Sequence, residues 1–97
     1  MKKAKQVVNR KFRYDDGAIR EMIVWELPES VLGSEHTYEY SFYYGKDGER
    51  IVGYDNERGK GDHKHLGEAE HPYIFTDIRQ LVSDFYDDIQ EVRNNEQ

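Results

Sequence analysis

One stretch of the chain, residues 54–65 (YDNERGKGDHKH), brings together almost every type of side chain that enzymes use for catalysis. It contains imidazoles, carboxylates, amines and a guanidinium, and it has no aliphatic residue that could anchor a core. Glycines at positions 59 and 61 allow positive φ or a close approach of the backbone to a ligand at little steric cost. We call residues 54–65 the polar motif, and we predict that it is a formed loop that holds a functional site.

The polar motif has the groups that metal-independent cleavage of RNA requires. That reaction needs a base for the 2′-hydroxyl, an acid for the departing oxygen and cations for the charge on phosphorus. The predicted catalytic residues are Glu57, Arg58, Lys60, Asp62, His63 and His65. The predicted substrate-binding residues are Tyr54, Asp55, Asn56, Gly59, Gly61 and Lys64.

Charge suggests the roles of four of these residues. Glu57 or Asp62 would serve as a base or orient an imidazole. Arg58 and Lys60 would bind phosphate and stabilise the charge that develops on it. The alternative without catalysis is that these charges form a salt-bridged loop or a protein interface.

The two histidines of the polar motif, His63 and His65, titrate near neutral pH and are the candidates for proton transfer. Because they are two positions apart, we expect them to point to opposite sides of an extended segment. Only one would then be central to the site. We favour His65, which precedes Leu66 and lies nearer to the returning core.

A metal site is an alternative for the same region, since imidazole nitrogens and carboxylate oxygens are common ligands of divalent metals. Asp62, His63 and His65 would supply ligands, with His36 or His71 as a further candidate. The H-x-H spacing is common, however, and no helical i, i+4 ligand pair accompanies it. We therefore predict no metal and no cofactor. The two glycines match neither a Walker A loop nor a dinucleotide fingerprint, which argues against nucleotide hydrolysis.

The elements that position the polar motif are predicted from periodicity. Alternating apolar residues bounded by turn signals indicate strands over about 5–14, 18–27, 37–44 and 49–56. Asp15-Asp16-Gly17 and Asp47-Gly48 supply tight turns. The last of these strands leads into the polar motif, and we predict a loop over 54–71. Trp25 is predicted to lie in the core, and the alternating aromatic residues of the third strand are more typical of core pairs than of a platform for stacked bases.

The C-terminal segment, about 77–93, predicts one amphipathic helix. Its apolar stripe consists of Ile78, Leu81, Val82, Phe85, Ile89 and Val92. Thr76 is the predicted N-cap, and Asp77 favours the positive end of the helix dipole. The chain is therefore predicted to be a single α+β domain over residues 1–97, a four-stranded antiparallel β-meander packed against one C-terminal α-helix. One helix covers only one face of the sheet, so the remaining aromatic residues are expected to meet a partner, either another protein or a second copy in a homodimer.

Composition limits the class of protein and of partner. The chain has 97 residues, no cysteine and a formal net charge of −6. With no apolar segment long enough for a membrane span or a signal peptide, we expect a soluble, cytoplasmic protein with no membrane contact. Residues 1–13 carry six basic groups and no acid, whereas residues 84–97 carry five acids and one arginine. RNA or the ribosome could bind the basic end, or the asymmetry could be a solvated surface.

The polar motif resembles the signature of the TumE family, toxins of bacterial toxin-antitoxin pairs. The resemblance extends through Ile23-Val24-Trp25, Leu27-Pro28, Gly33-Ser34, His36, His71-Pro72-Tyr73, Phe75-Thr76 and Asp84-Phe85. It implies the toxin component of a type II system with a cognate antitoxin as partner, and it implies no particular reaction. The polar motif, and not the resemblance, is what suggests an enzyme that acts on RNA as a ribonuclease does. The alternatives are a non-enzymatic protein- or RNA-binding module that blocks a cellular target, and a metal-binding domain.

Overall fold

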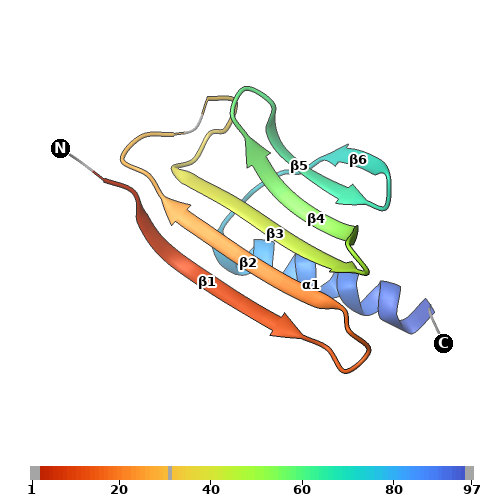
Figure 1. Cartoon of the computed structure of the whole chain (residues 1–97). Coiled ribbons are helices and arrows are strands. Elements are labelled where there is room, and N and C mark those ends of the chain that lie inside the picture. Colours follow the sequence, from red (N-terminus) through yellow and green to blue (C-terminus); the bar gives the residue numbers. More distant parts are fainter. Residues whose placement is uncertain (1–2, 31, 96–97) are drawn as a thin grey trace.

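The computed structural model describes residues 3–30 and 32–95. In chain order the elements are β1 (Lys5–Arg13), β2 (Ile19–Glu26), β3 (Tyr38–Lys46), β4 (Glu49–Glu57), β5 (Gly61–Leu66), β6 (Ala69–Pro72) and α1 (Ile78–Asn95). The strands form one antiparallel sheet in the order β1-β2-β3-β4-β5-β6. Figure 1 shows α1 lying along one side of this sheet. No helix formed by the described residues has the length and apolar character that a membrane crossing requires.

The predicted class and the predicted meander are confirmed, but the number of strands was wrong. The first four strands and α1 begin and end within two residues of the predicted ranges. The predicted loop over 54–71 is instead the end of β4 followed by β5 and β6, which extend the meander to six strands. Residues 61–66 contain four consecutive polar side chains, so the apolar alternation that marks a half-buried strand is missing there.

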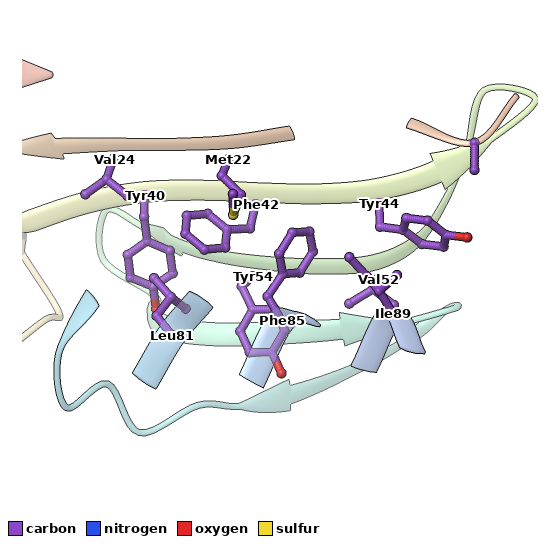
Figure 2. Packing of buried hydrophobic residues seen from close by; sticks show 11 residues of the cluster. Met22, Val24, Tyr40, Phe42, Tyr44, Val52, Tyr54, Leu81, Phe85 and Ile89 are labelled. Atoms are coloured by element: carbon purple, nitrogen blue, oxygen red, sulfur yellow. The ribbon is translucent and has the colours of Figure 1, made fainter. Parts of the chain in front are cut away.

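The core lies between the sheet and α1. Figure 2 shows Phe85 of α1 beside Phe42 and Tyr54, and its ring centroid lies 5.2 and 6.0 Å from theirs. The predicted helical stripe is confirmed, since its central residues Leu81, Phe85 and Ile89 are buried. Such edge contacts between aromatic rings add to the free energy gained from burying apolar area.

The cap of α1 is Asp77 and not the predicted Thr76. The Asp77 carboxylate accepts a hydrogen bond from the backbone N–H of Gln80 at 2.7 Å. This is the contact that an N-cap side chain makes with the third residue of a helix. Thr76 is one position too early to make it.

The two faces of the sheet differ in what lies on them. We call the side that packs on α1 the covered face; it carries Met22, Val24, Tyr40, Phe42 and Tyr54. We call the opposite side the open face. Trp25, which was predicted to be in the core, lies there and is 36% exposed. The buried face of β2 is that of Met22 and Val24, so Trp25, which alternates with them, points away from the core.

Candidate functional site

The polar motif forms a hairpin between β4 and β5. Gly59 and Gly61 have φ values of 84° and 77°, so the positive φ that the sequence suggested is present. The loop between β2 and β3 packs closely on this hairpin. A Cβ on Gly61 would lie 2.9 Å from the carbonyl oxygen of Gly33, and the N–H of Gly59 donates to the carbonyl oxygen of Leu32 at 2.7 Å. Glycine at position 61 therefore permits the contact that holds the loop against the hairpin.

Strand alternation divides the polar motif between the two faces of the sheet. The covered face receives Tyr54, Asn56, Asp62 and Lys64, and the open face receives Asp55, His63 and His65. The expectation that the two histidines point to opposite sides was wrong, because residues two positions apart in a strand share a face. Their ring centroids are 4.9 Å apart.

Three side chains meet on the open face, and we call Asp55, His63 and His65 the open-face cluster. Asp55 Oδ1 lies 2.6 Å from His63 Nε2 and 3.6 Å from His65 Nε2. The two imidazole side chains are only 7% and 12% exposed, whereas the Asp55 side chain is 35% exposed. Asp55 Oδ1 is nevertheless buried, and no group among the described residues donates a hydrogen bond to it. The cluster thus contains a carboxylate oxygen without a donor.

Arg50 and Glu70 flank the open-face cluster. A Cβ on Gly53 would lie 2.8 Å from Cδ of Arg50, so the missing side chain of this glycine makes room for the arginine. Glu70 is the cross-strand partner of His65, with Oε2 3.9 Å from His65 Nδ1. Burial and then the Arg50 charge lower the pKa of His65, and together they outweigh the nearby carboxylates. The imidazole is therefore held in its neutral form at pH 7.

A second group of polar side chains lies on the covered face around Asp62, and we call it the Asp62 network. Asp62 accepts hydrogen bonds from Ser34 Oγ at 2.5 Å, His36 Nε2 at 2.6 Å and the Tyr40 hydroxyl at 2.8 Å. The backbone N–H of Tyr38 donates to His36 Nδ1 at 3.1 Å, which places the His36 proton on Nε2. Burial and the bond to Asp62 raise the pKa of Tyr40. Both carboxylate oxygens and both imidazole nitrogens have partners, so these contacts tie the β2–β3 loop to β5.

Other predicted binding residues on the covered face make structural contacts. The Asn56 side chain accepts from the N–H of Tyr40 at 2.9 Å and donates to the carbonyl oxygen of Tyr38 at 2.6 Å. It thereby continues the connection between β3 and β4 beyond the last backbone pair. Tyr54 is buried in the core, and Lys64 Nζ lies 5.7 Å from the centroid of its ring.

Glu57, Arg58 and Lys60 lie at the exposed tip of the hairpin. Lys60 Nζ is 3.3 Å from Glu57 Oε2, and both side chains are 62% exposed. The structure brings these two residues to each other and not to the imidazoles. Salt bridges this exposed contribute little to stability.

The sequence-based metal alternative chose the wrong carboxylate. Asp62 and His36 belong to the covered face, where they bind each other, and His71 pairs with Lys64 across β5 and β6. Asp55 is the carboxylate that meets the two imidazoles. A hairpin centred on residues 58–60 would have placed residue 55 opposite residue 63, so the glycines of the turn were the usable signal. Nothing in the local pattern pointed to Arg50 or Glu70.

The similarity of the chain to a known family covers almost all of the elements described above. The family model described as Toxin TumE matches residues 2–93. No match was found among curated proteins or among solved structures. The matched range includes the six strands, both polar groups and most of α1. The chain therefore belongs to the TumE family of toxins.

Proposed function

We propose that this toxin is the protein-neutralised component of a type II toxin-antitoxin pair, and that it cleaves RNA at the open-face cluster. One observation carries the proposal. A carboxylate and two imidazoles share a sheet face that α1 does not cover, and the nearest atoms of Asp55 lie 2.6 and 3.6 Å from the two imidazoles. Groups of these types can take a proton from a 2′-hydroxyl and return one to a leaving oxygen.

Arg50 supplies the positive charge that such a reaction needs. Its side chain lies over Gly53, next to the cross-strand position of His65. A guanidinium stays protonated at every physiological pH and binds phosphate oxygens through paired N–H groups. The open-face cluster and Arg50 together therefore suit a phosphodiester better than an uncharged substrate.

A row of cross-strand neighbours on the open face leads from the cluster to the basic edge strand. Lys11 pairs with Glu21, Glu21 with Tyr43, Tyr43 with Gly53, and Gly53 with His65. The row crosses four strand spacings, about 19 Å. Of the four basic residues of β1, Lys11 and Arg13 lie on the open-face register. A single RNA strand lying along this row would meet positive charge at β1, then the carboxylate of Glu21 and the ring of Tyr43 on its way to the cluster.

The second candidate is a toxin that blocks its target by binding alone. The exposure of Trp25 and Val7, 36% and 47%, favours it, because exposed large apolar side chains mark interaction surfaces when they lie together. The two residues lie on neighbouring strands, and Trp25 pairs with Gln6 next to Val7. This surface is also where an antitoxin or a second copy of the chain would bind.

Induced expression separates the two candidates. We expect the wild type and His71→Ala to stop growth and to degrade total RNA, whereas Asp55→Asn and His63→Ala should do neither. His71 is the matched control because it is an exposed histidine outside the cluster. Loss of an acid or base lowers a rate by about 10²- to 10⁴-fold, so toxicity should disappear even at high expression.

Two outcomes would contradict RNA cleavage at the open-face cluster. Growth arrest by the wild type with intact RNA would favour the blocking toxin. Cluster variants that stay fully toxic at unchanged melting temperature would exclude the open-face cluster.

Arg58→Ala and Lys60→Ala in the same assay test the predicted phosphate-binding role of the hairpin tip. Co-expression of the product of the neighbouring gene should restore growth if that product is the antitoxin.

A further inference from the structure

We propose that the open-face cluster binds one divalent transition-metal ion through Asp55 Oδ1, His63 Nε2 and His65 Nε2. Ligand atoms of the three residues all lie within 4.8 Å of one another. Zinc-type ions bind nitrogen and oxygen at about 2.0 to 2.2 Å, which places neighbouring ligand atoms about 3 to 3.5 Å apart. The separations from Asp55 Oδ1 to the two nitrogens are 2.6 and 3.6 Å, one below and one just above that range. The three side chains need only small shifts to converge on one ion.

The orientation of the His63 ring is the one that a metal ligand at this place would have. His63 Nδ1 lies 3.1 Å from the carbonyl oxygen of Gly61, and a carbonyl can only accept, so Nδ1 carries the proton. In the neutral ring Nε2 then has a lone pair, and it faces the buried Oδ1 of Asp55 at 2.6 Å. Two electron-rich atoms at this distance repel each other. Either a second proton on the ring or a metal ion bound by both atoms would remove this repulsion.

The surroundings of the two imidazoles match those of metal ligands. Histidines that bind metals usually donate their second N–H to a carbonyl or a carboxylate, which fixes the ring. His63 does so to Gly61, and His65 Nδ1 faces Glu70 Oε2 at 3.9 Å. His36 differs, because both of its nitrogens are already hydrogen-bonded. Around the ion, the negative charges of Asp55 and Glu70 would more than offset the single positive charge of Arg50.

The ligand set indicates which ion would bind and what it would do. Two imidazoles and one carboxylate suit Zn²⁺, Mn²⁺ or Fe²⁺ better than Mg²⁺ or Ca²⁺, which prefer oxygen ligands alone. Three protein ligands leave a coordination position for water or substrate, as in catalytic sites. A catalytic role of the ion in RNA cleavage rests on the function proposed above, and water on the ion would then replace the imidazoles as the base, because a nitrogen that binds a metal cannot take a proton. The binding of the ion does not depend on that function.

Isothermal titration calorimetry of the full-length, chelator-stripped protein with ZnCl₂ and MnCl₂ tests the proposal without RNA. We expect one ion per chain for the wild type and for His71→Ala, and at least tenfold weaker binding for Asp55→Asn and His65→Ala. Bound ion should also raise the melting temperature of the first pair only. Circular dichroism shows whether each variant folds, and His65→Gln replaces His65→Ala if that variant does not.

Failure of the wild type to bind either ion, or equal binding by all variants, would overturn the proposal. In folded wild type, bound Zn²⁺ should shift the Nε2 resonances of His63 and His65 in nitrogen NMR spectra, and unchanged resonances would also overturn it. A wild type that binds the ion but leaves RNA intact would support the metal site and reject the proposed function. Undiminished RNA cleavage after chelation would reject the catalytic role of the ion while the binding data stand.

Discussion

Each face of the sheet at the β4–β5 hairpin has an aspartate close to a histidine, but the hydrogen bonding of the two aspartates differs. On the covered face, the oxygens of Asp62 accept three hydrogen bonds, one of them from His36. On the open face, Asp55 lies between two imidazoles, and its Oδ1 accepts none. Asp62 and Asp55 come from neighbouring strands, and the sequence favoured Asp62 as the carboxylate of the site.

The difference teaches that composition alone does not separate a structural cluster from a functional one. Buried polar groups that stabilise a fold are hydrogen-bonded, because an unpaired one costs free energy. An unpaired group persists where a ligand supplies the missing contact or where the function requires it. The Asp62 network therefore has the properties of a structural support, and the open-face cluster has those of a site. The following predictions test that division.

The largest effect should come from truncating the central side chain by which α1 packs on the covered face. Phe85 is fully buried against Phe42 and Tyr54, so Phe85→Ala should lower the free energy of unfolding by about 3 to 5 kcal/mol. Urea unfolding measures this change. Ser83→Ala, at an exposed position of the same helix, is the control and should have little effect. A melting temperature of Phe85→Ala within a few degrees of wild type would contradict the packing described here.

The two carboxylates should differ in what they contribute to stability. Asp62→Ala leaves the buried Tyr40 hydroxyl without its acceptor and should cost about 1 to 3 kcal/mol. Asp55→Ala in metal-free buffer should change the free energy of unfolding by no more than about 0.5 kcal/mol, because it removes an oxygen that has no donor. Urea unfolding of both variants in the same buffer gives the comparison. If Asp55→Ala were the more damaging change, the assignment of the two clusters would be reversed.

A smaller effect should distinguish the two glycines of the hairpin. Both have positive φ, so an alanine at either is strained by about 1 kcal/mol. A Cβ on Gly59 meets no atom within 4 Å, whereas one on Gly61 lies 2.9 Å from the carbonyl oxygen of Gly33. Gly61→Ala should therefore cost about 1 kcal/mol more than Gly59→Ala, because the loop must move. Equal melting temperatures of the two variants would show that the loop does not hold this position in solution.

The smallest effect should appear at alkaline pH and only on the covered side. Burial and a hydrogen bond to a carboxylate raise the pKa values of Tyr40, Tyr54 and Tyr73 above their ordinary value of 10. The acceptors are Asp62, Asp88 and Asp84. Because the folded pKa values are raised, this contribution to stability is complete below pH 10 and is lost as the pH rises further. Phenolate absorbance at about pH 11 should be lower in the folded than in the unfolded chain.

Tyr73→Phe provides the matched control for that titration. It removes one hydroxyl and keeps the ring, which packs edge-on against Tyr54 at 4.9 Å. The difference in phenolate absorbance between folded and unfolded protein should decrease by the contribution of one tyrosine. Superimposable titration curves for folded and unfolded wild type would contradict the hydrogen bonds assigned to these hydroxyls.

Some features of this protein are determined by the sequence alone. The four long strands and α1 follow from residue periodicity, because the burial of every second or of every third to fourth residue is a local pattern. The Asp47-Gly48 turn was equally local, and both residues have the positive φ of a tight hairpin turn. The polar motif was recognisable as unusual because it lacks any aliphatic residue.

Only the tertiary structure decided which residues of the polar motif meet. β5 shows no apolar alternation, so its pairing with β4 depends on backbone hydrogen bonds, and those pair Asp55 with His63. The pairing of β3 with β4 has a register shift near Gly45. Arg50 is at this irregular part of β4, and its side chain lies over Gly53. Register and face are relations between strands, and a one-residue slip would move every side chain to the other side of the sheet. For that physical reason the sequence indicated which region holds the candidate site, while the fold decided that Asp55 and not Asp62 meets the two imidazoles.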